Sequence, residues 1–410
     1  MGARPLRILW AKVGPLWPPD TGGRLRSLNL LVELSRAHQM TVLTTNGPGD
    51  ADQSGLAERL PMAERVVSVP HAIPKRGSAR FVAALARSWL SPLPVDLAKF
   101  RAATLRHEIA RTLATGAIDV CVADFLSATP NVDFGGPVPV LFFAHNVESM
   151  IWKRLRDVER APHKRAALEI EWRKMRRWEA RVVRRAGLTV AVSDVDAERL
   201  QALAPGARVC AVPTGVDTDY FAPSGAPERP GRVVFTGSMD WHPNEDGALH
   251  FMEAVLPAVR AAVPETSFAI VGRNPTARLR AAAAGADAIV TGTVDDVRPY
   301  LAEAAVCVVP LRVGGGTRLK IFEALAMGKP VVSTTIGAEG LPLTPDVHFV
   351  QADDPAAFAA GLIALLREPG RRAALGAAGR RLVEERYAWR QVAKEFELRC
   401  EEARENHHAR

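Results

Sequence analysis

The chain has 410 residues, and at about 150 residues per domain it should form two or three domains. Its 48% hydrophobic and 24% charged residues exclude a disordered or fibrous protein. The formal charge of +8 is compatible with an anionic partner but does not identify one. The apolar runs fall short of the ~20 residues that span a bilayer, and Arg4, Arg7 and Lys12 interrupt the N-terminal run. We therefore expect a soluble, cytoplasmic protein without a signal peptide.

The positive charge lies mainly in the first half. Residues 1–215 carry 31 Lys+Arg and 20 Asp+Glu, a balance of +11. Within them, residues 151–185 carry 13 basic and 5 acidic side chains. This asymmetry predicts that the first half meets an anionic partner. A membrane surface and nucleic acid are the two candidates, and a solvated helix face is the structural alternative. We favour the inner face of a membrane, because no nucleic-acid-binding motif accompanies the charge.

The first half is predicted to alternate strands and helices. Strands are expected at 6–13, 40–45, 65–69, 118–123, 138–143 and 188–192, and helical segments at 24–37, 78–115 and 149–185. Pro92, Pro94 and Pro162 should interrupt the two long helical segments. Trp172, Met175, Trp178 and Val182 follow helical spacing, which predicts a stripe that faces the core.

After a linker at 213–231, the second half repeats this alternation. Strands are expected at 232–236, 267–271, 287–290, 305–309 and 330–333, with helices at 245–263, 275–283, 295–303, 317–327, 370–385 and 389–406. Short Val- and Ile-rich strands that alternate with helices indicate parallel sheets buried on both faces. We predict an α/β fold with two doubly wound Rossmann-like domains facing across a cleft. Their boundaries are 1–213 and 214–388, and the helix at 389–410 is expected to pack back on the first domain.

The four cysteines are Cys121, Cys210, Cys307 and Cys400. Their positions lack the spacing of a zinc site, and the first three lie in strand-like runs. We expect small buried thiols in a reducing compartment rather than a disulfide framework.

The most informative loop follows the strand at 305–309. Gly314, Gly315 and Gly316 precede a helix that should open at Thr317. Consecutive glycines allow a ligand close to the backbone, and a helix start offers unpaired N–H groups. Lys320 would add a full charge for phosphate, and Glu323, one turn later, could hold ribose hydroxyl groups. The alternative is a glycine-rich turn that carries a surface Lys–Glu pair.

Two further loops are candidates in the first half. Gly22 and Gly23 precede a helix and permit a phosphate to approach, although no Walker A lysine follows. His145 comes just after the apolar strand at 138–143 and could contact a reacting centre, or it could cap the next helix. The Asp194-Val195-Asp196 and Asp217-Thr218-Asp219 triplets are interpreted as a helix cap and a turn rather than as metal ligands.

With these loops identified, nearly the whole chain resembles the GT-B-fold, retaining, nucleotide-sugar-dependent glycosyltransferases of group 1, of the glycosyltransferase family 4 type. The Gly-Gly-Thr-Arg-Leu-Lys form at 315–320 is most similar in style to bacterial exopolysaccharide sugar transferases. The segments that carry the resemblance, in family order, are Gly22-Gly23, His145-Asn146-Val147-Glu148, Val192-Ser193, Val212 to Asp217, Val234 to Met239, Pro243-Asn244 and Lys320 to Val331.

The resemblance implies roles for these residues. The donor would be bound by Gly22, Gly23, Gly237, Gly314, Gly315, Gly316, Thr317 and Glu323. Many relatives have a glutamate where this chain has Gly315. They also carry an Arg and a Lys after the glycine that matches Gly237, where this chain has Ser238, Met239 and Asn244. Lys320 and Arg318 are therefore the cations left for the diphosphate, and His145 would contact the reacting sugar.

The resemblance implies an enzyme of the hexosyltransferase class with no resident cofactor and no metal. Its substrates would be a nucleotide sugar and a glycan, lipid-linked or small-molecule acceptor, and a protein that uses a lipid-linked acceptor would attach peripherally to the membrane. A sugar-nucleotide epimerase of the same fold and a non-catalytic GT-B scaffold protein are the two alternatives.

Overall fold

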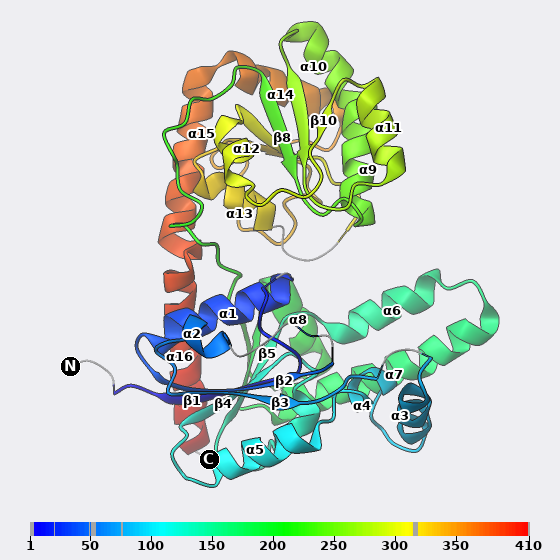
Figure 1. Cartoon of the computed structure of the whole chain (residues 1–410), viewed down its shortest axis with the longest axis vertical. Helices are drawn as coiled ribbons and strands as arrows, with labels where there is room; N and C mark the ends of the chain where they lie inside the picture. The colour runs from blue at the N-terminus through cyan, green and yellow to red at the C-terminus, as the bar shows by residue number, and fades with distance from the viewer. Residues whose placement is uncertain are drawn as a thin grey trace. The chain divides into compact units, whose positions relative to one another are not determined.

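In a computed structural model, the chain forms two α/β units (Figure 1), and the described residues are 4–19, 21–48, 50, 55–74, 77–314 and 319–408. Contacts divide the chain into a first unit, Met1–Pro213 with Val392–Arg410, and a second unit, Thr214–Gln391. Each unit has its own parallel sheet. No described helix combines the length and the apolar character that crossing a bilayer requires.

The first unit contains a seven-stranded sheet in the order β3-β2-β1-β4-β5-β6-β7. Every pairing in it is parallel. Its strands are β1 (Arg7–Lys12), β2 (Gln39–Asn46), β3 (Arg65–Pro70), β4 (Val120–Asp124), β5 (Val140–Ala144), β6 (Leu188–Ala191) and β7 (Val209–Ala211). Its helices are α1 (Gly22–Ser35), α2 (Leu56–Arg59), α3 (Ala79–Trp89), α4 (Val95–Ala98), α5 (Ala103–Leu113), η1 (Thr129–Asn131), α6 (Glu148–Val158), α7 (Pro162–Arg185) and α8 (Asp194–Leu203).

The second unit contains a six-stranded sheet in the order β10-β9-β8-β11-β12-β13, which is also parallel throughout. Its strands are β8 (Arg232–Thr236), β9 (Ser267–Val271), β10 (Ile289–Val290), β11 (Val306–Val309), β12 (Val331–Ser333) and β13 (Val350–Gln351). Its helices are α9 (His242–His250), η2 (Phe251–Val255), α10 (Leu256–Ala262), α11 (Ala277–Gly285), α12 (Arg298–Glu303), α13 (Leu319–Ala326), α14 (Pro355–Arg367), α15 (Pro369–Leu382) and η3 (Val383–Tyr387), followed by α16 (Trp389–His408).

These topologies confirm the prediction of two doubly wound Rossmann-like units. Some boundaries differ from the predicted ones. The first helix begins at Gly22 rather than Arg24, because Thr21 is the N-cap and its hydroxyl accepts from the Arg24 N–H. The expected helix at 245–263 begins at His242 and is divided by the π-helical turn η2. Strands β7 and β13 and helix α14 are additions to the sequence-based assignment.

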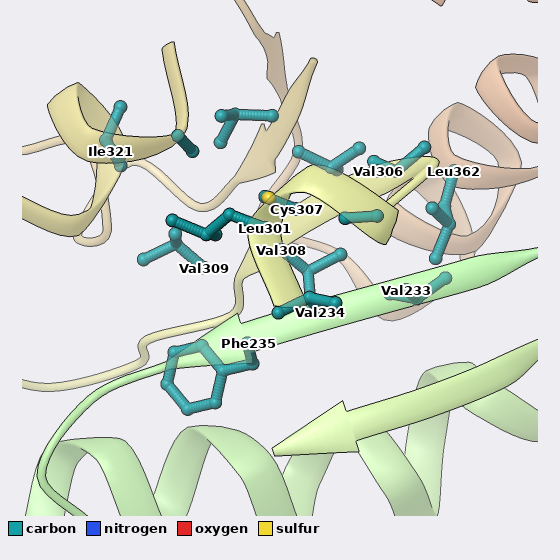
Figure 2. Close-up of a cluster of buried hydrophobic side chains, with 14 of the residues drawn as sticks. Val233, Val234, Phe235, Leu301, Val306, Cys307, Val308, Val309, Ile321 and Leu362 are labelled. Carbon is teal, nitrogen blue, oxygen red and sulfur yellow. The ribbon is translucent and has the colours of Figure 1, made fainter. Parts of the chain in front are cut away.

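Apolar strands form the centre of the second unit's core. Val233 and Phe235 on β8 lie beside the β11 residues, and Leu301 and Ile321 contribute from α12 and α13 (Figure 2). These side chains are essentially inaccessible to solvent. A strand buried on both faces explains why the sequence shows short continuous apolar runs rather than alternation.

The last helix supplies side chains to the first unit's core. Phe396 of α16 is fully buried, and its ring lies 5.6 Å from Trp10 and 5.0 Å from Phe143. Glu397 forms an ion pair with His38 at 3.3 Å. Residues 392–410 therefore belong structurally to the first unit, although about 180 residues of the second unit separate them from it in sequence.

Helices α6 and α7 form a hairpin that carries the basic segment (Figure 1). Met175 and Val182 are buried, and Trp172 and Trp178 are half-buried against the same cluster. The predicted core-facing stripe is therefore confirmed. Glu179, also buried, accepts the Glu148 N–H at 2.7 Å and the Ser149 N–H at 3.1 Å. This carboxylate caps α6 from the neighbouring helix, and burial raises its pKa to about 7.

Cys121, Cys307 and Cys400 are buried and Cys210 is half-buried, with no disulfide. Burial raises the pKa of each thiol, which keeps all four protonated and unreactive. The prediction of small buried thiols holds for three of the four.

Helix α15 packs closely against its neighbours at Gly376. A Cβ atom there would lie 2.0 Å from the Gly328 carbonyl oxygen, whereas one at Gly370 would meet nothing within 4 Å. Helix propensity alone favours alanine over glycine by about 1 kcal/mol. We expect Gly376→Ala to lower the free energy of unfolding by about 1–3 kcal/mol through overpacking. The control Gly370→Ala, on the same helix, should be neutral or stabilising in the same denaturant titration, and equal effects would contradict close packing.

Candidate functional site

In each sheet, the strand order reverses direction beside one central pair of strands. The pair is β1 and β4 in the first unit, and β8 and β11 in the second. Loops leave the carboxyl ends of such a pair in opposite directions and open a crevice, where ligands of doubly wound folds bind. Polar side chains gather at both of these positions. We name the two groups of residues the β4 cluster (Lys12, Asp124, His145, Arg26 and Ser27) and the β8 cluster (Gly237, Asn244, Lys320 and Glu323).

Asp124 is the centre of the β4 cluster. It ends β4 opposite Lys12, which ends β1. Its Oδ2 accepts from the Lys12 ammonium at 2.9 Å, the Ser27 hydroxyl at 2.7 Å and the Trp10 indole N–H at 3.1 Å. The carboxylate is inaccessible to solvent. Burial alone would raise its pKa, but Lys12 and the hydrogen bonds to the carboxylate hold that pKa well below its usual range.

The second oxygen of Asp124 fixes His145, which directly follows β5. Oδ1 lies 2.6 Å from the His145 Nε2, and the Arg26 Nη1 lies 2.8 Å from Nδ1. Because a guanidinium can only donate, Nδ1 accepts and the ring proton resides on Nε2. Burial lowers the pKa of His145 to about 3, against the attraction of Asp124. The ring is therefore neutral at pH 7, with a single defined tautomer.

An aromatic ring completes the enclosure of His145. Phe125 stacks on the imidazole at 3.6 Å between centroids and an interplanar angle of 7°. It has a φ of 70°, which is rare for a residue other than glycine. A Cβ at Gly23 would lie 2.3 Å from the Phe125 ring, whereas one at Gly22 would meet nothing within 4 Å. Gly23 is therefore needed for packing, and only Gly22 leaves open space beside the backbone.

The β8 cluster is built around Gly237, the residue after β8. Its missing side chain makes room for Lys320, because a Cβ there would lie 2.7 Å from the ammonium and 2.6 Å from the Asn244 amide nitrogen. The Lys320 ammonium donates to the Asn244 Oδ1 at 2.7 Å and lies 4.3 Å from the centre of the Phe235 ring. Asn244 in turn donates to the Ser238 carbonyl at 2.8 Å. The ammonium is thus held at the carboxyl end of β8.

Glu323 lies one turn beyond Lys320 on α13. Burial raises the pKa of its carboxyl group to about 7, partly opposed by the charge of Lys320. Within the described residues, the carboxylate accepts no hydrogen bond. A largely desolvated acceptor without a donor suits a ligand that supplies hydroxyl groups. The structure therefore brings Lys320, Glu323 and Gly237 together.

Not every predicted site residue can be placed. Gly315, Gly316, Thr317 and Arg318 lie outside the described residues, and Gly314 is the last residue described before them.

The two Asp-x-Asp triplets have the predicted local roles. Ser193 caps α8, with Asp194 and Asp196 in its first turn. Asp217 accepts the N–H groups of Asp219 and Tyr220 in a turn. Among the described residues, no three His, Cys, Asp or Glu side chains are grouped to hold a metal ion.

Four further residues of the site were not predicted: Lys12, Asp124, Arg26 and Ser27. A signal for the first two exists in the sequence: each is a charged residue that ends an apolar strand, in Ile8 to Lys12 and in Val120 to Asp124. Arg26 and Ser27 carry no such signal, because they lie on one turn of a helix whose other residues follow ordinary helical spacing. Asn244 was named as part of the resemblance and as a departure from the family's basic residues, but not as a site residue, whereas the structure shows it positioning Lys320.

Removing the charge of Asp124 tests the β4 cluster. Asp124→Asn leaves the Lys12 ammonium buried without its counter-charge, which typically costs about 3–5 kcal/mol. We expect a loss of unfolding free energy of that size. In a double-mutant cycle, Lys12→Met/Asp124→Asn should be more stable than the sum of the single effects predicts. Strictly additive losses in chemical denaturation would show that the two charges are not coupled.

The pH dependence of stability tests the burial of Glu323. Its pKa of about 7 in the folded protein exceeds the value of about 4.5 of an exposed carboxyl. As pH rises from 4.5 to 7, the unfolded chain releases this proton before the folded chain does, so the folded state loses stability. We expect Glu323→Gln to gain stability relative to wild type at pH 8 but not at pH 4. The exposed Glu253→Gln on η2 is the control, and a pH-independent difference for Glu323→Gln would contradict this origin.

Comparison with known proteins places these features in a family. The model described as Glycosyltransferase Family 4 matches residues 21–220, and the model described as Glycosyl transferases group 1 matches residues 230–368. Phosphatidyl-myo-inositol mannosyltransferase of Mycobacterium leprae is 33% identical over 234 residues, which are 54% of this chain and 60% of the relative. GDP-mannose-dependent alpha-(1-6)-phosphatidylinositol monomannoside mannosyltransferase of Mycolicibacterium smegmatis is 31% identical over 46% of this chain and 55% of the relative. The chain thus spans between half and three fifths of the curated relatives it matches.

Solved structures extend the likeness to almost the whole chain. Sucrose-phosphate synthase of Thermosynechococcus elongatus matches with a TM-score of 0.66 and 16% identity, over 96% of this chain and 98% of that one. HepE of Anabaena in complex with UDP matches with a TM-score of 0.63 and 12% identity, over 96% and 99%. At these identities the likeness shows the fold, which is of the GT-B type. Family models on both units and this shared fold lead to one conclusion: the chain belongs to the group 1, family 4-type glycosyltransferases.

Proposed function

We propose that this protein is a retaining, metal-independent glycosyltransferase that moves a hexose from a nucleoside diphosphate sugar to a glycan, lipid-linked or small-molecule acceptor. The observation that carries the proposal is the Lys320 ammonium at the carboxyl end of β8, one turn from the Glu323 carboxylate, which accepts no hydrogen bond among the described residues. A cation beside a hydroxyl acceptor fits the diphosphate and ribose of such a donor. The M. smegmatis relative is named as GDP-mannose-dependent, so GDP-mannose is the first donor to test.

The chemical demand on the second unit is to stabilise the leaving diphosphate. Donors that are already oriented can do this at little reorganisation cost. Asn244 and Gly237 fix the Lys320 ammonium before any ligand arrives. Lys320 would then neutralise the charge that develops on the diphosphate, together with backbone amides from Gly314 onward. Arg318 stays a predicted second cation.

In the first unit, we propose that His145 contacts the reacting sugar. Both ring nitrogens are engaged in the structure, Nε2 with Asp124 and Nδ1 with Arg26, so a substrate hydroxyl would have to replace Arg26 at Nδ1. The cluster's rigidity supports this role, because a fixed tautomer orients the ring without further cost.

Nucleotide release is the direct test of this function. Purified protein should release the nucleoside diphosphate from one donor among the UDP-, GDP-, ADP- and dTDP-sugars, and should form a glycoside when an acceptor is present. EDTA should leave the rate unchanged. A rate abolished by EDTA and restored by Mg²⁺ or Mn²⁺ would contradict metal independence, and donor turnover to an epimeric nucleotide sugar would identify an epimerase instead.

Lys320→Ala should lower kcat by roughly 10²-fold, because it removes a group that stabilises the charge of the transition state. Nucleoside diphosphate affinity should fall as well, measured by calorimetry. Lys394→Ala on α16 is the matched control, since Lys394 is an exposed lysine outside the site. Unchanged turnover in Lys320→Ala would remove this residue from the mechanism.

We also propose that the α6–α7 hairpin attaches the protein to an anionic membrane. Its surplus of basic residues is joined by exposed apolar side chains, with Leu155 46%, Val158 75% and Ile170 55% exposed. Basic side chains near anionic lipid contribute about 1 kcal/mol each, and apolar side chains add burial in the interface. These features favour peripheral attachment over a merely solvated face.

Vesicle co-sedimentation tests this attachment. Wild type should sediment with phosphatidylglycerol vesicles at low salt and be released at high salt. Leu155→Glu/Val158→Glu should weaken the binding, whereas Val347→Glu, at an exposed site of the second unit, should not. If wild type stays in the supernatant at low salt, the hairpin is a solvated face and a soluble acceptor becomes the better proposal.

A further inference from the structure

The first unit contains a cavity of about 610 Å³ away from the β4 cluster. It is lined by residues of α3, α4 and α5, by the segment that follows β3, and by Asn131 of η1. Its size lies within the range of small-molecule sites. The lining residues that the structure describes all belong to the first unit.

One side of the cavity is positively charged. Lys99, Arg101 and Arg106 contribute to the lining. Lys99 is already paired with Asp96. Neither Arg101 nor Arg106 pairs with a carboxylate among the described residues. Two guanidinium groups without counter-charges on one cavity favour an anionic ligand, and arginine matches the geometry of phosphate oxygens.

The backbone on this side is fixed and adds donors. Asn131 is buried, accepts the Ala102 N–H at 2.9 Å and donates to the Phe100 carbonyl at 3.0 Å. His71 contacts the Lys99 carbonyl at 3.0 Å. These bonds hold the loop that leads into α5. Helix α5 itself starts after Ala102 without a side-chain cap, so its first N–H groups reinforce the preference for an anion.

The other side of the cavity is apolar. Ala83 and Ala84 of α3, Leu93, and Ala98 of α4 line it. Helix α3 ends beside this lining with two large apolar residues in solvent, Trp89 at 70% and Leu90 at 91% exposure. Small side chains leave room for an extended hydrocarbon chain, and the exposed pair offers it a surface outside the cavity.

The composition of the lining also argues against other ligands. Among the described residues of the lining, none carries a carboxylate and His71 supplies the only aromatic ring. Neutral sugars are usually held by carboxylates and aromatic faces, and a nucleotide needs an acceptor for its ribose. Phosphate on an apolar chain matches both sides of this cavity.

We propose that this cavity binds the phosphate group of an amphiphilic acceptor, with its hydrocarbon chain along α3. The inference rests on the proposed function, since it assigns a chemical class to the acceptor. A membrane phospholipid and a phosphorylated carrier lipid share this chemistry.

Calorimetric titration with water-soluble amphiphiles tests the site. Dihexanoyl phosphatidic acid, a phosphomonoester, and dihexanoyl phosphatidylglycerol, a phosphodiester, are the anionic probes, and dihexanoyl phosphatidylcholine is the zwitterionic one, each below its micelle concentration. We expect an anionic probe to bind at least tenfold more tightly than both phosphatidylcholine and inorganic phosphate. Preference for the monoester indicates a carrier-lipid phosphate, and preference for the diester indicates a phospholipid. Equal affinity for inorganic phosphate would show that the apolar side contributes nothing and would overturn the inference.

Three variants locate the binding. Arg101→Gln/Arg106→Gln and the cavity-filling Ala83→Trp should each weaken the anionic probe at least tenfold, whereas Arg111→Gln, on the same helix outside the cavity, should not. Donor hydrolysis without acceptor should persist in all three variants. If probe binding is unchanged in the first two while donor hydrolysis persists, the cavity assignment fails and the proposed function stands. If the wild-type protein itself turns over none of the donors, that result would instead count against the proposed function.

Discussion

The first unit depends on one buried ion pair at the point where its strand order reverses. Lys12 and Asp124 end neighbouring parallel strands in register, so their charges meet inside the protein at 2.9 Å. Burying such a pair is costly unless every remaining lone pair finds a donor. Ser27 and His145 supply two of those donors. The same requirement explains why His145 has one tautomer and why its surroundings are rigid: any rotation of the ring would leave a buried carboxylate oxygen without a partner.

The second unit uses the equivalent position differently. Its β8 cluster is held by a neutral amide, since Asn244 positions Lys320, and the glycine after β8 makes room for the ammonium. Glu323 is left without a hydrogen-bond donor among the described residues, at a cost in stability that rises with pH. A cluster whose polar groups are all hydrogen-bonded holds a side chain in one orientation. A carboxylate without hydrogen-bond donors gains the most stabilisation when a ligand supplies them. This contrast supports donor binding in the second unit.

Much of this was predictable from sequence, because parallel strands buried on both faces leave continuous apolar runs such as Val306 to Val309. Strands β7 and β13, of three and two residues, were not predicted. Loop glycines and Lys320 were found from local spacing. Of the β4 cluster only His145 was found, because Lys12 and Asp124 are 112 residues apart and only strand register brings them together. Gly23 was predicted to let a phosphate approach the backbone. The structure gives a different reason for a glycine at this position, because a side chain there would collide with the Phe125 ring.

The distribution of charge differs between the two units. Little of the surplus of +11 in residues 1–215 lies at the β4 cluster, where burial leaves His145 neutral, Asp124 balances Lys12, and Arg26 adds one positive charge. It lies instead on the α6–α7 hairpin and around the cavity beside α3. The second unit has a net negative balance in sequence and places one fixed cation at the end of β8. A donor diphosphate would be stabilised by such a fixed cation. An amphiphilic acceptor at an anionic membrane would instead suit a surface with many basic residues and exposed apolar side chains. If both proposals hold, the first unit would carry the membrane attachment as well as the site for the acceptor's phosphate, and an amphiphilic acceptor would suit this chain better than a neutral soluble one.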